Sequence, residues 1–372
     1  MVNIYELAFS KIYGIGAKTA LDLLNKIPSP EDLFAMKRKD LQTIFSKERT
    51  IQDILNKTMF HQCERELNFL EKNNIRSYFV THSSYPKNLK NIPDPPICLF
   101  VDGKGEFDNK HIVSIVGSRM ATPYGQAMTE QIVQELKKLD VIIISGLAFG
   151  IDSASHRAAL KNDIPTFAVL GHGLDRIYPS QHYTLAQSMK ERGGLISEFF
   201  TGTNVSPYTF PQRNRIIAGI SDLVIVVEAA KKGGALITAR LANDYNREVF
   251  ALPGRVGDKY SEGCNFLIYS SRAHILSSFK NISSLMSWEE EEKMVFEPIA
   301  TQENNIITID KSSTLPDKQK NIYTTLINKG EMDIDTLALE CKISINELSA
   351  LLLEMELEDY VLSKPGKIYK AL

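Results

Sequence analysis

The alternation of apolar runs with helical segments between residues 111 and 254 constrains the fold of this chain most. Six runs, beginning with HIVSIVG and DVIIISG, are short and rich in β-branched residues, and segments of helical character lie between them. Such alternation indicates βαβ units, in which helices cover both faces of a parallel sheet. We therefore predict an α/β fold with a doubly wound, mostly parallel sheet, whose ligands bind at the carboxyl ends of the strands.

The segments before this region have a different pattern. Residues 4–70 have apolar residues at helical spacing, interrupted by Gly14-Ile15-Gly16. This break resembles the turn of a helix-hairpin-helix module, where backbone amides can meet a DNA phosphate, but short helical modules use the same turn for many purposes. We favour a structural or protein-binding role for it. After the proline-broken connector, residues 98–101 are predicted to form an edge strand.

The C-terminal part is predicted to be a separate domain. Residues 288–316 are acidic and polar without a period, which indicates a linker that keeps the last domain mobile. Residues 317–372 contain three helical stretches and two short strands, the pattern of a winged helix. The third stretch is acidic and lacks Lys and Arg, which favours protein docking over contact with phosphates. Its acidic residues are Glu347, Glu354, Glu356 and Glu358. The predicted domains are therefore residues 1–75, 76–287 and 317–372, with the linker between the last two.

Composition limits the partners that the chain can have. The 43 Lys and Arg residues nearly balance 45 Asp and Glu residues, so nucleic-acid binding would need a local basic patch. The four cysteines are far apart and form no CxxC pair, which argues against a disulfide framework or a zinc site. No apolar stretch is long enough to span a bilayer, and we expect a cytoplasmic location without membrane contact.

Candidate ligand-binding residues recur at the predicted strand ends. Glycines there let a ligand approach the backbone, arginines offer a fixed positive fork, and helix starts expose backbone amides. One arginine would indicate a structural ion pair, whereas the repetition predicts an anionic ligand of some length. The candidates are Gly117, Ser118, Arg119, Gly146, Leu147, Gly150, Phe210, Arg213, Asn214, Arg215, Gly233 and Gly234. The loop from Gly146 to Gly150 would supply amides and the arginines would supply charge.

Enzymatic motifs are missing from these strand ends. The chain has no GxGxxG after the first strand, no GxxxxGK[ST] and no GxSxG, so no cofactor is predicted. Asp152 is expected to cap a helix or hold an arginine, and His156 to be a packed or surface histidine. His172 is expected to form a hydrogen bond within its loop.

Two carboxylates, Glu198 and Glu228, also end predicted strands. They are the only pair suited to acid or base work. A buried carboxylate needs a cationic partner, so we expect them instead to orient the candidate arginines.

Several motifs occur in an order that resembles one protein family. The series includes IVGSRMATPYG, SGLAFGIDSASHRAAL, GHGLDRIYP, FPQRNRIIAGISD and GGALITARLA, and it covers roughly residues 80 to 280. It resembles the DNA-processing protein A family, also called Smf. The resemblance implies an extended Rossmann-like domain between an N-terminal helical domain, similar to SAM or helix-hairpin-helix modules, and a C-terminal winged helix. The family's basic pocket arginine falls on Arg119, and its RNR segment on residues 213–215.

The resemblance also implies a function. It predicts single-stranded DNA binding, a homodimer formed through the Rossmann-like domain, and delivery of a RecA-type recombinase onto incoming strands in natural transformation. We expect a non-enzymatic protein in which arginines hold phosphates while Tyr124, Phe149 or Phe210 stack on bases. One alternative is a nucleotide phosphoribohydrolase on the same fold, although KKGGALITA lacks the catalytic glutamate of those enzymes. Another is a docking scaffold for which DNA contact is incidental.

Overall fold

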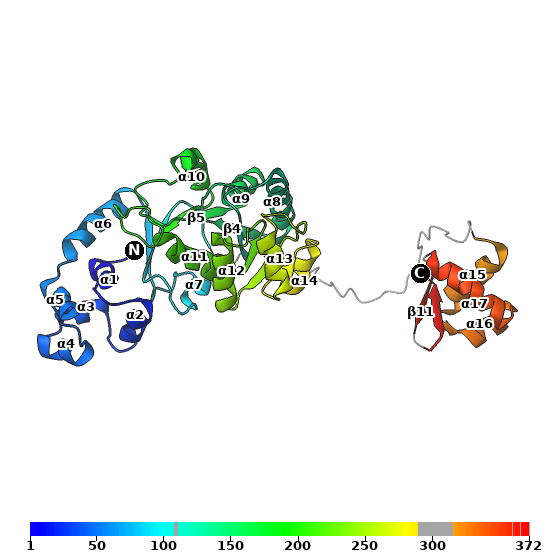
Figure 1. Ribbon diagram of the computed structural model, residues 1–372. Helices are drawn as coiled ribbons and strands as arrows, with labels where there is room; N and C mark the ends of the chain where they lie inside the picture. Colours follow the sequence, from blue (N-terminus) through cyan, green and yellow to red (C-terminus); the bar gives the residue numbers. More distant parts are fainter. Residues whose placement is uncertain (108–110, 289–314, 359, 365, 372) are drawn as a thin grey trace, which may run out of the picture. The chain divides into compact units, whose positions relative to one another are not determined.

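The computed structural model describes residues 1–107, 111–288, 315–358, 360–364 and 366–371. The chain divides into two compact units, Met1–Lys293 and Met294–Leu372, each with its own hydrophobic core (Figure 1). Most of the predicted linker, residues 289–314, lies outside the described residues. Within the described ranges, no helix combines the length and the apolar character that a bilayer span requires.

The N-terminal part of the first unit is helical, as predicted. Asn3 and Glu6 form a capping box at the first helix, and Ser29 caps the third, which begins at Pro30. The predicted break falls between α1 and α2, where Gly14 has a φ of +79°. The six helices are α1 (Ile4–Phe9), α2 (Ala17–Leu24), α3 (Pro30–Ala35), α4 (Arg38–Ile44), α5 (Glu48–Asn56) and α6 (Phe60–Lys72).

A nine-stranded sheet forms the centre of this unit. Its strands are β1 (Arg76–Phe79), β2 (Cys98–Asp102), β3 (His111–Val116), β4 (Val141–Ser145), β5 (Thr166–Val169), β6 (Gly194–Ser197), β7 (Leu223–Val226), β8 (Glu248–Ala251) and β9 (His274–Ile275). The order is β1-β2-β6-β5-β4-β3-β7-β8-β9, parallel from β6 to β9 and antiparallel at β1 and β2. The predicted doubly wound sheet is confirmed. The predicted edge position of residues 98–101 is wrong, because β1 pairs with β2 and forms that edge.

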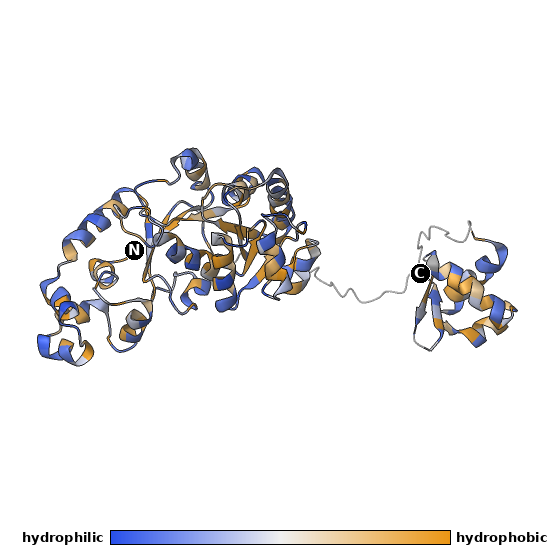
Figure 2. Ribbon diagram, in the orientation of Figure 1, coloured by the Kyte–Doolittle hydropathy of each residue, from blue (hydrophilic) through white to orange (hydrophobic). Residues whose placement is uncertain are grey.

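Helices cover both faces of the sheet, because the strand side chains alternate between two cores. Ile142 and Ile144 belong to one core, while Ile143 between them belongs to the other. Figure 2 shows hydrophobic strands inside and hydrophilic residues on the outer helices. The helices of this part are α7 (Lys87–Lys90), α8 (Pro123–Leu136), α9 (Ile151–Lys161), α10 (Tyr183–Met189), α11 (Thr209–Ile220), α12 (Gly234–Asp244), α13 (Glu262–Tyr269) and α14 (Lys280–Met286), with short 3₁₀ turns at Lys137–Leu139 and Ser180–His182.

The strand order reverses at β3. The chain passes from β3 to β4 on one side, whereas β7, which pairs with β3 on the other side, comes later in the sequence. The loops that follow β3 and β7 therefore lead away from each other and leave a crevice at the carboxyl ends of these strands. This is where an open α/β sheet binds its ligand.

The second unit is a winged helix, as predicted. It consists of α15 (Asp317–Lys329), β10 (Met332–Asp333), α16 (Ile334–Cys341), α17 (Ile345–Leu357), β11 (Val361–Lys364) and β12 (Ile368–Ala371). The side chains of Asp333 and Ser344 cap α16 and α17. The two-residue strand β10 had no sequence signal, because it forms by pairing with β12.

Candidate nucleic-acid interface

A cavity of about 450 Å³ lies at the crevice beside β3 and β7. Its walls come from the loops after β3, β4 and β7 and from the first turns of α11 and α12. Eight of the twelve predicted contact residues line it. They are Gly117, Ser118, Arg119, Phe210, Arg213, Asn214, Gly233 and Gly234. Gly146, Leu147, Gly150 and Arg215 are not among its lining residues.

Two arginines converge on one aromatic ring in this cavity. The guanidinium carbon of Arg119 lies 5.1 Å from the ring centroid of Phe210, and that of Arg213 lies 5.8 Å from it. Arg119 is exposed and forms no ion pair within the part of the chain that the structure describes. Two positive groups around one ring favour an anion between them, and the ring offers a stacking face beside it.

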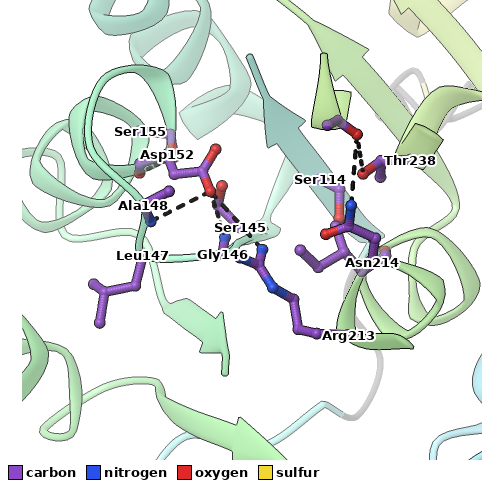
Figure 3. A network of polar contacts seen from close by, with 12 residues as sticks. Ser114, Ser145, Gly146, Leu147, Ala148, Asp152, Ser155, Arg213, Asn214 and Thr238 are labelled. Carbon is purple, nitrogen blue, oxygen red and sulfur yellow. Dashed lines mark hydrogen bonds and ion pairs between the residues drawn. The ribbon is translucent and has the colours of Figure 1, made fainter. Parts of the chain in front are cut away.

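Arg213 is the buried member of this pair. It is only 5% exposed, and its nearest acid, Asp152 of α9, lies 3.9 Å from Nη1 (Figure 3). The Nε of Arg213 has no acceptor among the described residues. Burial lowers the pKa of Arg213 and the neighbouring Arg119 lowers it further, while Asp152 acts in the opposite direction. The Nε of Arg213 is therefore a buried donor without an acceptor among the described residues, and the guanidinium adds positive charge to the cavity wall.

The start of α12 forms the open wall of the cavity. Gly233 occupies the N-cap position without a side-chain cap, and Lys232 next to it is exposed and lines the cavity. A Cβ built on Gly234 would have no atom within 4 Å. The carbonyl oxygen of Gly234 accepts hydrogen bonds from the Asn214 side-chain amide (3.5 Å) and the Thr238 hydroxyl (3.4 Å). An uncapped helix start beside cationic groups suits a phosphate.

Two amides of the loop from Gly146 to Gly150 are engaged within the protein, contrary to the expectation that the loop supplies them to a ligand. The backbone N–H groups of Gly146 and Ala148 donate to the Asp152 carboxylate at 3.2 and 3.4 Å. Leu147 is fully buried, and its carbonyl oxygen is bonded to His182. A Cβ on Gly150 would fall 2.1 Å from the Ser118 carbonyl oxygen. These residues pack the loop against neighbouring segments, so their role is to support the cavity wall and not to contact a ligand.

Arg215 faces away from the cavity that Arg213 lines. Its guanidinium pairs with Glu198 and donates to the Asp94 carbonyl oxygen at 2.5 Å. It lies in a separate pocket that Lys11 and Gln212 also line. Residues two positions apart on an α-helix are rotated by about 200° around its axis, so Arg213 and Arg215 lie on nearly opposite sides of α11. Arg215 is therefore not one of the proposed contacts.

The expectation that both strand-end carboxylates hold arginines is met by only one of them. Glu198 pairs with Arg215, and burial raises the pKa of Glu198. Glu228 instead accepts hydrogen bonds from the backbone and hydroxyl of Thr122, at the start of α8. Asp152 holds Arg213, which is one of its two expected roles, but its carboxylate accepts from two loop amides and does not cap α9.

The two histidines have structural roles here. His156 is fully buried and its Nδ1 is 2.7 Å from the Thr166 hydroxyl; burial lowers the pKa of His156 to about 3. His172 bonds within its own loop to the carbonyl oxygen of Gly173, as expected. Neither histidine lines the cavity.

Sequence reasoning missed Lys232, which lines the cavity, and Tyr178, which lies beside the ring of Phe210 but is not itself a lining residue. Lys232 immediately precedes the Gly233-Gly234 pair, and this position was the available signal. Tyr178 is half exposed and lies 6.4 Å from Phe210 between ring centroids, although no local pattern connects the two. Tyr124 and Phe149 are exposed but are not lining residues.

The N-terminal helical segment packs against the Rossmann-like part of the same unit through side chains outside its glycine turn. The Lys11 ammonium lies 3.9 Å from the ring centroid of Phe200, and burial lowers the pKa of Lys11. Glu66 of α6 accepts hydrogen bonds from the backbone and hydroxyl of Thr201. These contacts support a structural role for the helical domain.

The architecture and this cationic crevice define an open α/β protein with a site suited to an anionic ligand, and comparison with known proteins gives the family. The profile described as DNA recombination-mediator protein A matches residues 76–287, and that of the DprA winged helix domain matches residues 310–367. The chain belongs to the DNA recombination-mediator protein A family.

Individual relatives agree with this assignment. The Smf protein of Synechocystis sp. is 34% identical over 331 residues, which cover 81% of this chain and 82% of the relative. The crystal structure of DNA processing protein A from Streptococcus pneumoniae matches 76% of this chain and 98% of its own, with a TM-score of 0.66 and 31% identity. DNA processing protein A from Helicobacter pylori, whose structure concerns its single-stranded DNA binding mode, matches 57% of this chain and 95% of its own, with a TM-score of 0.52 and 29% identity.

Proposed function

We propose that this protein is a non-enzymatic recombination mediator that binds single-stranded DNA, protects incoming strands and loads a RecA-type recombinase onto them during natural transformation. The observation that carries the proposal is Arg213, a buried guanidinium at the cavity wall whose Nε has no acceptor among the described residues and whose acid partner is 3.9 Å away. A phosphodiester in the cavity would neutralise the positive charges of Arg213 and of Arg119 beside it.

In this proposal the cavity divides into a phosphate side and a base side. Arg119, Lys232 and the uncapped start of α12 hold phosphates, while Phe210 and Tyr178 stack on bases. Stacking accepts any base, so binding would tolerate changes of sequence. Because the phosphate contacts release counterions, affinity would fall steeply with added salt.

A homodimer through the Rossmann-like domain is also part of the proposal. The two-residue strand β9 ends the sheet, and large apolar side chains of α13 and of β9 itself are exposed. Phe266 is 50%, Tyr269 88% and Ile275 46% exposed. An apolar group beside an open sheet edge suits a second copy of the chain.

The winged helix is proposed to dock a protein, such as the recombinase. On α17, Glu347 forms an ion pair with Lys318, and Glu354 accepts a hydrogen bond from Gln319. Both acids therefore face α15. The outward side of α17 instead carries Ile345 and Leu353, which are 49% and 59% exposed. An apolar outward side lacks the cations that a phosphate-lined groove requires.

Fluorescence anisotropy with labelled oligo-dT over a series of salt concentrations tests the DNA-binding proposal. Replacing Arg119 and Lys232 together by Ala should weaken binding at least about tenfold. The slope of log K against log salt concentration should become less steep by ~0.7 for each phosphate that is no longer neutralised. Replacing Lys138 and Lys161, which lie away from the cavity, should change neither quantity. A flat salt response of the parent protein would reject the phosphate contacts.

The phosphoribohydrolase alternative is tested by a different product. Incubation with nucleoside monophosphates followed by chromatography would show released base if the protein were such an enzyme. The carboxylate that lines the cavity, Asp152, is engaged by Arg213 and two loop amides. This engagement favours the binding proposal over hydrolysis.

A further inference from the structure

The loop that carries Arg119 is attached at both ends to a single residue, Glu228. The backbone N–H of Ser118 donates to the Glu228 carbonyl oxygen at 2.7 Å, just before Arg119. The backbone N–H of Thr122 donates to the Glu228 carboxylate at 2.9 Å, just after the loop, and the Thr122 hydroxyl donates to the other carboxylate oxygen. Arg119 lies between these two attachment points.

Glu228 is built into this position. It is 4% exposed and follows β7, which pairs with β3, so both ends of the interaction are held by the sheet. A Cβ on Gly125 would fall 2.3 Å from the carboxyl carbon of Glu228, which means that only glycine in the first turn of α8 admits the carboxylate. The Thr122 hydroxyl also accepts a hydrogen bond from the Gly125 N–H at 3.0 Å and caps the helix.

The carboxylate occupies the start of the helix that follows the first parallel strand. In a doubly wound fold this helix start attracts an anion, because its N–H groups and dipole point outward. Here the chain supplies that anion itself. A nucleotide phosphate is thereby excluded from α8, whereas the uncapped start of α12 across the cavity remains open.

We propose that Glu228 is a positioning residue for DNA binding, which acts through Thr122 to hold Arg119 at the cavity. The inference rests on the proposed single-stranded DNA binding and adds a residue that does not touch the ligand. Arg119 has no ion pair within the described ranges, so the loop backbone, and not an acid partner, sets its direction. Ordering the loop before binding spares the entropy that Arg119 would otherwise lose.

A double-mutant cycle in the full-length protein tests this. Glu228→Gln removes one acceptor at Thr122 and should weaken oligo-dT binding about tenfold, on the scale of one charge-assisted hydrogen bond. In the background of Arg119→Ala, the same change should cost less than about twofold. Equal losses in both backgrounds, or no loss in either, would overturn the inference.

Glu198→Gln is the matched control. It also alters a buried carboxylate that follows a strand, but one that holds Arg215 outside the cavity, and it should leave the Arg119-dependent affinity unchanged. Thr122→Ser keeps the hydroxyl and should retain parental binding, whereas Thr122→Val should behave like Glu228→Gln. A binding loss in Glu198→Gln as large as that in Glu228→Gln would indicate a general structural effect and contradict the proposal.

Hydrogen exchange separates the inference from the proposed function. Amides of residues 118–122 should exchange faster in Glu228→Gln and at the parental rate in Glu198→Gln, with or without DNA. If the parent protein fails to bind oligo-dT, the proposed function fails, and unchanged exchange in the loop would reject the inference by itself.

Discussion

The guanidinium of Arg213 lies directly on the backbone of Gly146: a Cβ on Gly146 would fall 1.5 Å from Nη1. The sequence pattern suggests that a ligand approaches the backbone at Gly146. The space beside this glycine is instead occupied by the guanidinium of Arg213. Gly146 has its place because Arg213 must cross the end of β4 to reach Asp152.

Gly146→Ala should therefore impair both folding and binding. The methyl group would displace the Arg213 guanidinium from Asp152, and we expect the free energy of unfolding to fall by about 1–3 kcal/mol. Oligo-dT affinity should fall with it, because Arg213 leaves the cavity wall. Urea unfolding and anisotropy measure the two effects, and parental behaviour in both would contradict the role given to Arg213.

Gly234→Ala should weaken oligo-dT binding without lowering the stability of the protein. No atom lies within 4 Å of the added Cβ, and Ala favours the helix, so the free energy of unfolding should be unchanged or slightly higher. The methyl group enters the space where we place a phosphate, so oligo-dT affinity should fall severalfold. Tight binding by this stable variant would show that the strand does not approach α12.

Arg119→Ala and Arg215→Ala should have opposite profiles. Arg119 is exposed and forms no ion pair within the described residues. Its removal should make the slope of log K against log salt concentration less steep by ~0.7 and leave the melting temperature near that of the parent protein. Removal of Arg215 strands the buried Glu198 carboxylate and should cost about 3–5 kcal/mol of stability, with the salt dependence retained. Calorimetry and anisotropy on both variants check this; a reversed pattern would return Arg215 to the binding surface.

Stability should depend on pH through His156. Burial lowers the folded-state pKa of His156 from 6.5 to about 3. A depressed pKa contributes stability that is present above pH 6.5 and lost as the pH falls toward 3, which amounts to about 2 kcal/mol at pH 5. Urea unfolding at pH 7 and pH 5 should show this loss in the parent and not in His156→Gln.

The comparison with His156→Gln is needed because other groups act in the opposite sense. Burial raises the pKa of Glu66, Glu198 and Asp152, so their contribution to stability increases as the pH falls. These carboxylates are common to parent and variant, and the difference between the two proteins isolates the histidine. An equal pH response in both would mean that His156 does not titrate in this range.

Removing the winged helix should leave DNA binding intact. The core of the C-terminal unit is made of buried residues between Leu315 and Ala371 and shares no member with the two cores of Met1–Lys293. A chain that ends at residue 293 should keep the melting temperature of the first unit and its oligo-dT affinity, while losing capture of the recombinase. A large drop in affinity would assign DNA contact to the winged helix.

Much of the cavity could be predicted from sequence because it is made of strand ends. Gly117, Arg119 and Gly233 lie in the connections that follow apolar runs, and the ends of parallel strands must meet at one edge of the sheet. The sequence could not tell Arg213 from Arg215, since the two are separated by one residue on α11 and only packing decides which side of the helix faces the cavity.

The sequence by itself determined the doubly wound sheet, the helical N-terminal segment, the winged helix and the strand ends that carry glycine and arginine, because hydrophobic periodicity and turn residues are local properties. Only the tertiary structure decided how the polar groups are paired. The Asp152 carboxylate accepts hydrogen bonds from the amides of Gly146 and Ala148, and the Glu228 carboxylate accepts one from Thr122 at the start of α8. The start of α12 has no side-chain cap. These pairings join residues that the fold brings together from distant positions, and a local pattern carries no information about which partner a buried charge will find.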